Sequence, residues 1–309
     1  PYFNIGPLYL IQRITPPAQT ANGSTPLVGA IPMGKVLTQQ QIDDYQTTGF
    51  VSPIDVMSED EALAYAQRLQ HAETQYPSDL RGANRNNAHL CFKFLDELAY
   101  HPRVLDAVED LIGAEFSLWG SVLFIKEPSS SHFVSWHQDA TYMGITPRHF
   151  VTPWIALTPS TRQPGCMSMI PGSHHNDIQP HEDTYGADNI LTRGQEVKNI
   201  DPSQAVDLIL KPGQMSIHHA MIVHGSQPNL SKHQRRIGFA LQSFMPTGAR
   251  QTIGKNYWSP VRGRCAQASD VALKRPNHDM DPTGIAERNK ANKNFSDILY
   301  HGAKTKRDY

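Results

Sequence analysis

The sequence lacks the features that mark secreted and membrane-spanning proteins. Its three cysteines, Cys91, Cys166 and Cys265, are an odd number at wide spacings, which is typical of reduced thiols rather than of a disulfide framework. The longest apolar stretch, around residues 118–125, is far shorter than the roughly 20 residues needed to cross a bilayer. No basic region, apolar run and small-residue cleavage site follow one another at the N-terminus. We therefore expect a cytoplasmic protein.

An excess of charge of either sign is also absent. The chain of 309 residues has 28 lysines and arginines against 29 aspartates and glutamates, a formal net charge of −1. A nucleic acid or an anionic membrane is therefore not expected as a partner, and a small-molecule substrate is. Histidine is abundant at 15 residues, and 23 prolines and 21 glycines punctuate the chain, as many short strands joined by turns would require.

The periodicity of apolar residues changes along the chain from helical to strand-like. Residues 1–36 show no sustained periodicity and are predicted to form an N-terminal arm, ahead of a single domain over residues 37–309. Capping boxes at Thr38–Gln41 and Ser58–Glu61 predict two helices. A third helix is predicted between Pro102 and Gly113, from proline in its first turn, an apolar stripe and a final glycine.

Strands are predicted over residues 116–126, 150–157, 166–170, 206–210, 214–218 and 236–244. Helices followed by a run of strands indicate an α+β fold, with a β-sandwich or barrel core that helices flank. We place this core at about residues 114–246. Residues 247–309 are predicted to form a lid or packing tail with one helix near residues 284–300.

The chemistry is expected at His137, Asp139 and His224. One residue separates His137 from Asp139, so both side chains point to the same face of a strand. A second imidazole from a distant strand would complete a site, and His224 follows the predicted strand 214–218. Two histidines and one carboxylate on one face of an octahedron leave three open positions, the arrangement of iron(II) oxygenases.

Arg235 follows His224 by 11 residues, at the start of the last predicted strand. Its guanidinium could hold the far carboxylate of 2-oxoglutarate through two parallel hydrogen bonds, while the other end of that co-substrate chelates iron. A histidine-x-aspartate triplet alone often arises by chance. The interpretation as an iron site depends on its occurrence together with the later histidine and arginine. A zinc hydrolase and a non-catalytic jelly-roll binding protein remain as alternatives.

The other histidines in this half are expected at the surface or around the metal ligands rather than among them. They are His132, His149, His174, His175, His181, His218 and His219.

Six segments in order resemble the phytanoyl-CoA dioxygenase family of iron(II)- and 2-oxoglutarate-dependent oxygenases, and the similarity extends over about residues 37–244. The segments are Val134–Asp139, Val151–Leu157, Gly165–His174, Lys211–Gly213, His224–Ser226 and Arg235–Gly238. The resemblance implies a double-stranded β-helix core, which is a cupin-like jelly roll, with iron(II) as cofactor and 2-oxoglutarate and dioxygen as co-substrates.

Carried over by position, the resemblance makes His137, Asp139 and His224 the iron ligands. It makes Arg235 the anchor of 2-oxoglutarate, with Arg236 one alignment step away. Further positions match residues that line the co-substrate pocket, namely Ser226, Trp154 and, more weakly, Val122. Some members of the family also use a lysine ahead of the helix near Pro102, for which Lys93 and His89 are the candidates here.

Because Asp139 keeps the carboxylate that halogenating relatives replace with a small residue, the resemblance favours hydroxylation, or desaturation, over halogenation. The family accepts chemically diverse substrates, so the resemblance does not specify one. Arg193 lies in the long segment between the metal-binding halves, where a lid is expected, and is a candidate contact for an anionic substrate. Gln138, between the first two ligands, is a second candidate for substrate contact.

Overall fold

A computed structural model of the chain describes residues 34–263 and 270–307. Residues 1–33 of the predicted N-terminal arm, and Cys265, lie outside the described residues. The α-helices are α1 (Gln39–Thr48), α2 (Glu59–Gln75), α3 (Lys93–Ala99), α4 (Pro102–Ile112), α5 (Ala140–Met143) and α6 (Pro282–Leu299). Short 3-10 helices occupy Pro77–Leu80, Gly82–Arg85, Ala88–Leu90, Ser173–His175 and Pro202–Gln204. Within the described ranges, no helix combines the length and the apolar character that crossing a membrane requires.

The structure contains the three N-terminal helices predicted from the sequence. Thr38 and Ser58 each cap a helix, accepting from the backbone N–H three residues on, while that residue's side chain accepts from the cap's own N–H. Gly49 ends α1 in the left-handed conformation that glycine adopts without strain. Helix α3 was not predicted, because no side chain caps its N-terminus and five of its seven residues are buried, which hides the amphipathic pattern.

A nine-stranded, mainly antiparallel sheet forms the centre of the described part of the chain. Its strands are β1 (Phe50–Asp55), β2 (Phe116–Leu118), β3 (Val122–Lys126), β6 (Val151–Ala156), β11 (Gln214–His219), β13 (Arg236–Ala240), β14 (Phe244–Pro246), β16 (Tyr257–Arg262) and β17 (Val271–Ala272). Strand β6 pairs with β11 on one side and with β13 on the other, and β13 continues to β3. All six residues of β6 are buried.

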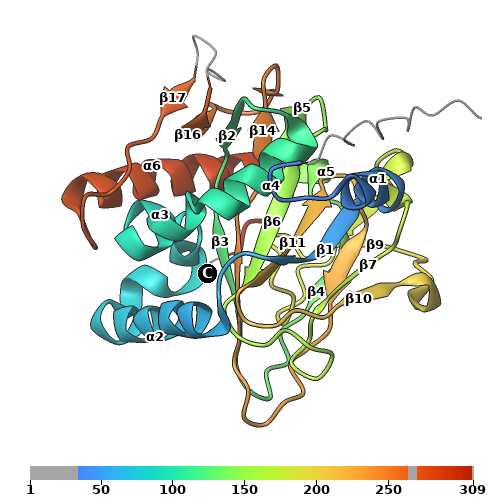
Figure 1. The fold of residues 1–309 in the computed structure, drawn as a ribbon, viewed down its shortest axis with the longest axis horizontal. Coiled ribbons are helices and arrows are strands. Elements are labelled where there is room, and N and C mark those ends of the chain that lie inside the picture. The colour runs from blue at the N-terminus through green and yellow to red at the C-terminus, as the bar shows by residue number, and fades with distance from the viewer. Residues whose placement is uncertain (1–33, 264–269, 308–309) are drawn as a thin grey trace, which may run out of the picture. The chain divides into compact units, whose positions relative to one another are not determined.

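Both faces of this sheet are covered, and alternate residues serve the two faces. On β13, Ile237 and Phe239 belong to the large apolar core shared with α2, α3 and α4. Arg236 and Ala240 alternate with them and face the opposite side, where they line a pocket. Figure 1 shows the helices α2, α3 and α4 together on one side of the sheet.

A second antiparallel sheet lies against that opposite side. It has the order β10 (Val206–Leu208), β7 (Met167–Met169), β12 (His224–Ser226) and β4 (Val134–His137). A small apolar core joins the two sheets, with Trp154 and Ala240 from the first and Met167 and Met169 from the second. Two facing antiparallel sheets around one core are the jelly-roll arrangement. The α+β fold predicted from the sequence is therefore confirmed.

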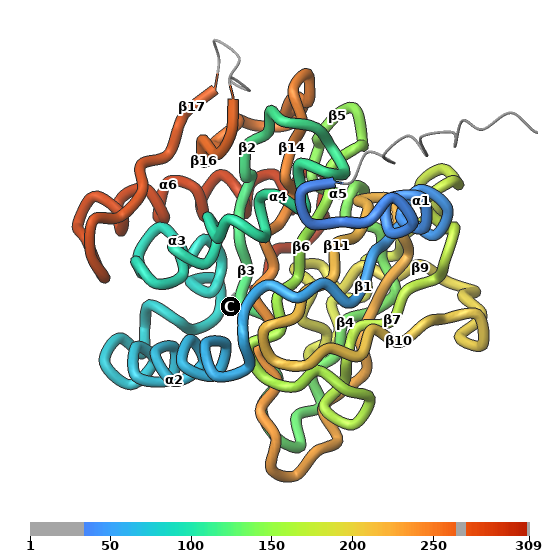
Figure 2. Tube along the Cα trace, viewed as in Figure 1, coloured from blue at the N-terminus to red at the C-terminus, as the bar shows by residue number. Residues whose placement is uncertain are grey.

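Smaller strand pairs and the C-terminal segment complete the fold. Strand β5 (Ile145–Thr146) pairs with β15 (Arg250–Gln251), and β8 (His181–Asp183) pairs with β9 (Gln195–Val197). After α6 the chain returns beside β3 in Figure 2, and residues of both line one cavity.

Two predictions for the C-terminal half need correction. The single strand predicted over residues 236–244 is two strands, β13 and β14, because the chain turns at Ser243, whose φ is +65°. The segment after residue 246 is less irregular than expected, since β16 extends the main sheet by pairing with β2. The helix predicted near residues 284–300 is present as α6.

Candidate active site

His137 and His224 occupy facing positions on the paired strands β4 and β12, and Asp139 follows β4 by two residues. One ligand atom from each of the three side chains can be chosen so that all lie within 4.8 Å of one another. The Nε2 atoms of His137 and His224 are 3.4 Å and 3.9 Å from Asp139 Oδ1. All three residues are buried, so the structure brings together the triad that the sequence indicates.

The backbone orients both imidazoles toward the shared centre. His137 Nδ1 donates to the carbonyl of Ser135 at 2.9 Å, and His224 Nδ1 donates to the carbonyl of Ile222 at 3.1 Å. Each Nε2 therefore keeps its lone pair for a metal. Histidines that bind metals commonly donate their other ring N–H in this way, which fixes the orientation and the tautomer of the ring.

The protonation states also suit a divalent cation. Burial on its own would raise the pKa of Asp139, but the imidazoles of His137 and His218 outweigh it and hold this pKa well below its usual value. Burial, together with the neighbouring His137 and His218, lowers the pKa of His224 well below its usual value. A carboxylate that stays ionised beside an imidazole that stays neutral is the donor set that iron(II) requires.

His218, which was expected at the surface or around the metal ligands, lies beside the same centre. Its Nε2 is 3.5 Å from Asp139 Oδ2, and its ring centroid is 4.6 Å from that of His224. Neither ring nitrogen of this buried residue has a hydrogen-bond partner among the described residues. A buried imidazole without partners beside the triad is consistent with a centre at which a bound ligand or water would accept or donate its missing hydrogen bonds.

A small pocket of about 50 Å³ adjoins the triad between the two sheets. Trp154 and Ser226 line it, as the resemblance implies, together with Arg236. The Arg236 guanidinium lies over the Trp154 ring, 5.2 Å from its centroid, and donates through Nη1 to the carbonyl of Gly165 at 2.8 Å. Its Nε has no partner among the described residues. Burial lowers the pKa of Arg236 to about 10, so the side chain stays cationic at neutral pH.

Arg235, the preferred anchor in the sequence analysis, does not line this pocket. It precedes β13 and points to the other side of the sheet, where its guanidinium donates to Glu73 of α2 at 2.8 Å and to Glu127 at 2.9 Å. Two carboxylates already satisfy its charge. The geometry therefore favours Arg236 as the anchor of 2-oxoglutarate. The alternation of side chains along β13 could have indicated this choice, because Arg236 shares a face with Gly238 and Ala240.

Gly238 permits the contact between Arg236 and Trp154. A Cβ atom at this position would lie only 1.7 Å from Trp154 Cζ2. The indole ring of Trp154 therefore lies against Gly238, and any larger residue at this position would displace the ring.

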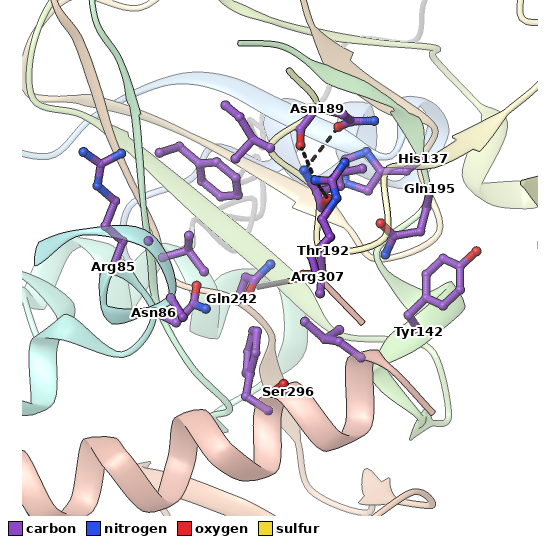
Figure 3. Close-up of a pocket in the computed structure, with 18 of the residues that line it drawn as sticks. Arg85, Asn86, His137, Tyr142, Asn189, Thr192, Gln195, Gln242, Ser296 and Arg307 are labelled. Atoms are coloured by element: carbon purple, nitrogen blue, oxygen red, sulfur yellow. Dashed lines mark hydrogen bonds between the residues drawn. The ribbon is translucent and has the colours of Figure 1, made fainter. Parts of the chain in front are cut away.

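A larger cavity of about 590 Å³ opens on the other side of the triad, and Figure 3 shows its lining. His137, Asp139 and Gln242 line both this cavity and the small pocket. The apolar part of the lining comprises Ala83, Val122, Leu123, Phe124, Ile125, Met143, Ala187, Ile190, Leu191, Phe295 and Leu299. Asp139 is the only carboxylate among the described lining residues.

The C-terminal segment holds the loop that covers this cavity. Arg307 donates to the backbone carbonyls of Gly186, Asn189 and Leu191, and its bond to Asn189 is drawn in Figure 3. The Tyr300 hydroxyl donates to the carbonyl of Thr192 at 3.0 Å. The tail predicted to act as a lid or packing element therefore packs against the cavity loop.

Arg193 does not line either cavity, so the structure does not support a substrate contact for it. Its guanidinium pairs with Asp183 and donates to the carbonyls of Leu299 and His301, and it lies over the Tyr142 ring at 4.6 Å. The residue fastens the C-terminal segment to the hairpin of β8 and β9 instead.

Gln138 and Val122 line the larger cavity. The Gln138 amide is held at both ends, since it donates to the carbonyl of Met221 at 2.7 Å and accepts from the N–H of Gln179 at 2.8 Å. Val122 is absent from the residues of the small pocket, so it lies on the wall of the larger cavity only.

Lys93 and His89 both lie away from the two cavities. The Lys93 ammonium pairs with Asp96, and His89 is buried between the hydroxyls of Ser121 and Ser259. Neither of these two candidates therefore contacts either cavity in this structure.

Comparisons with known proteins agree with this geometry. The sequence model of the phytanoyl-CoA dioxygenase (PhyH) family matches residues 28–237. A probable alpha-ketoglutarate-dependent hypophosphite dioxygenase of Stutzerimonas stutzeri is 30% identical over 165 residues, which cover 52% of this chain and 57% of that protein. The peroxisomal phytanoyl-CoA dioxygenase of Bos taurus is 30% identical over 142 residues, 44% of this chain and 42% of that protein. The chain thus spans about half the length of these curated relatives.

Solved structures extend the similarity beyond the core. The apo form of the non-heme monooxygenase ThoJ superposes with a TM-score of 0.75 at 28% identity, and the match covers 84% of this chain and 98% of that one. CytC3 with Fe(II) and alpha-ketoglutarate matches with a TM-score of 0.62 over 80% of this chain and 97% of that one. Its identity of 21% supports the shared fold alone.

Proposed function

Because the chain belongs to the phytanoyl-CoA dioxygenase family, we propose that it is an iron(II)- and 2-oxoglutarate-dependent dioxygenase that hydroxylates a C–H bond of a medium-sized organic substrate. The observation that carries this proposal is the buried triad of His137, Asp139 and His224 between two cavities, one with a free cation and one with an apolar lining. Dioxygen and 2-oxoglutarate would be consumed, and one oxygen atom would enter the substrate while the other enters succinate, with release of carbon dioxide.

His137, Asp139 and His224 would hold the iron, which when bound supplies the oxidising chemistry that no side chain can provide. Arg236 would bind the distal carboxylate of 2-oxoglutarate. Its pocket is closed by Trp154, and Ser226 offers a hydroxyl on the same wall. A buried guanidinium without a carboxylate partner costs free energy that a bound anion would offset. The protein's task is to orient the two substrates and to exclude water from the centre.

The larger cavity supports the substrate class. A volume of about 590 Å³ is within the range of sites for drug-sized molecules. Aliphatic and aromatic side chains supply much of its lining, and its polar part includes the amides of Gln242 and Asn86 and the basic side chains of Arg85 and Arg307. An ion as small as hypophosphite, which the name of one relative specifies, would leave most of this cavity unfilled. We therefore favour a largely apolar substrate with a few hydrogen-bonding groups.

Hydroxylation is the outcome that the carboxylate of Asp139 favours, and desaturation by the same centre is the alternative. Both would consume 2-oxoglutarate, so product analysis has to separate them: the hydroxylated product is heavier than the substrate by one oxygen atom, and the desaturated product is lighter by two hydrogen atoms.

The test is anaerobic titration of the metal-free protein with iron(II) and then with 2-oxoglutarate. Chelation by the 2-oxo acid should produce a weak visible charge-transfer band near roughly 500 nm, and succinate should form when oxygen is admitted. If iron binds and neither the band nor succinate appears, the dioxygenase proposal fails. A zinc hydrolase or a non-catalytic jelly-roll protein would then become the better interpretation.

A further inference from the structure

Two basic side chains are buried side by side at the small pocket. Lys126 of β3 and Arg236 of β13 occupy paired positions on neighbouring strands, and their exposed fractions are 0% and 2%. Among the described residues, every hydrogen bond of the ammonium and guanidinium groups goes to a neutral oxygen. Holding both groups charged there without a counterion would be costly, and a ligand with negative charge would lower that cost.

The two side chains are also connected to each other and to the pocket wall. Lys126 Nζ donates to Ser226 Oγ at 2.7 Å, to the carbonyl of Gln227, and more weakly to the carbonyl of Gly165 at 3.5 Å. Arg236 donates to the same Gly165 carbonyl. Because Ser226 Oγ accepts from Lys126, its own hydrogen is free to point into the pocket that Ser226 and Arg236 line.

We propose that Lys126 is a positioning residue for the distal carboxylate of 2-oxoglutarate, orienting the Ser226 hydroxyl toward it and adding a second positive charge behind it. This inference rests on the proposed function. The consequence is selectivity. Lys126 increases the preference of the pocket for 2-oxo acids that end in a second carboxylate, beyond the preference that Arg236 alone provides.

The charge of Lys126 depends on whether that carboxylate is present. Burial and the neighbouring Arg236 lower the pKa of Lys126 to about 6. Cys166 also faces the lysine, and because burial raises its pKa to about 11, its thiol stays neutral. Near pH 7.5 Lys126 is therefore mostly uncharged in the co-substrate-free protein. A carboxylate at the pocket stabilises the ammonium form, so binding of 2-oxoglutarate takes up a proton.

The first experiment compares two 2-oxo acids of equal length. The iron(II)-loaded protein is titrated anaerobically with 2-oxoglutarate and with 2-oxopentanoate, which has a methyl group in place of the distal carboxylate. In the Lys126→Met variant we expect the affinity for 2-oxoglutarate to fall by roughly 30-fold or more, while the affinity for 2-oxopentanoate changes by less than about 3-fold. Lys211→Met, at an exposed lysine, is the matched control and should behave as the unchanged protein.

The outcomes separate this inference from the function on which it rests. Equal losses for the two acids, or no loss for either, would show that Lys126 only supports the fold, and would overturn the inference while leaving the dioxygenase proposal in place. If the unsubstituted protein binds iron but responds to neither acid, both proposals fail together.

The second experiment needs no substitution at a buried site. Calorimetric titration of the iron-loaded protein near pH 7.5, in buffers of different ionisation enthalpy, gives the number of protons taken up per ligand bound. We expect close to one proton for 2-oxoglutarate and close to none for 2-oxopentanoate. Equal proton counts for the two acids contradict the role of Lys126.

Discussion

Replacement of Arg236 by glutamine tests which of two adjacent arginines binds the co-substrate. In Arg236→Gln the distal carboxylate of 2-oxoglutarate would lose its buried ionic partner. Truncation of one member of a buried, hydrogen-bonded charge pair costs about 2–5 kcal/mol. Because Arg236 is fully buried and its Nε has no other partner among the described residues, we take the upper part of this range, about 3–5 kcal/mol. That corresponds to a loss of affinity for 2-oxoglutarate of roughly 150- to 5,000-fold.

Arg235→Gln is the matched control. Its two ion pairs, with Glu73 and Glu127, are partly exposed, and pairs of this kind contribute about 0.2–1 kcal/mol each to the free energy of unfolding. We therefore expect a slightly less stable protein whose affinity for 2-oxoglutarate changes by less than about 3-fold.

The assay is the anaerobic charge-transfer titration of the iron-loaded variants, with thermal unfolding measured in parallel to establish that both fold. The reasoning would be refuted if Arg235→Gln lost the co-substrate and Arg236→Gln retained it. A large loss of affinity in both variants would likewise refute the assignment of separate roles to the two faces of β13.

Three further predictions address the metal, the packing and the pH dependence. Asp139→Ala should weaken iron(II) binding by at least about 100-fold, because loss of a direct ligand should cost more than the roughly 10- to 100-fold lost with a residue that only supports a ligand, as measured by anaerobic metal titration. Gly238→Ala should displace Trp154, costing about 1–3 kcal/mol in unfolding free energy and weakening 2-oxoglutarate binding, whereas Gly248→Ala, where a Cβ atom meets nothing within 4 Å, should affect stability alone. Burial lowers the pKa of His89 from 6.5 to about 4, so between these pH values the unfolded chain binds a proton that the folded chain does not. Up to about 3 kcal/mol of unfolding free energy should therefore be lost as the pH falls from 6.5 to 4. Denaturant titration across this pH range should show a smaller loss in His89→Gln than in the unchanged protein.

Several elements were predictable because local interactions determine them. The capping boxes at Thr38 and Ser58 satisfy N–H groups within three residues along the chain, so the sequence contains the whole interaction. Helix α3 shows the opposite case. It has no side-chain cap, and its buried residues contact elements distant in sequence, so its local pattern contained no comparable signal.

The active site divides in the same way. His137 and Asp139 are close in sequence, and their spacing alone places both side chains on one face. The choice between Arg235 and Arg236 depended instead on where β13 begins and which of its faces meets the second sheet. One residue of register exchanges the two faces of a strand, and the sequence spacing to His224 did not reveal that register.

The sequence by itself determined the candidate metal ligands, and with them the proposed reaction class, because metal ligation needs particular residue types in a particular order, and these are visible in the chain. Only the tertiary structure decided which arginine faces the pocket, that Lys126 is buried beside it, and that Arg193 donates to the C-terminal segment and lines neither cavity. These properties depend on pairing between strands and on burial by distant segments. Both arise from contacts between residues far apart in sequence, and no local pattern encodes them.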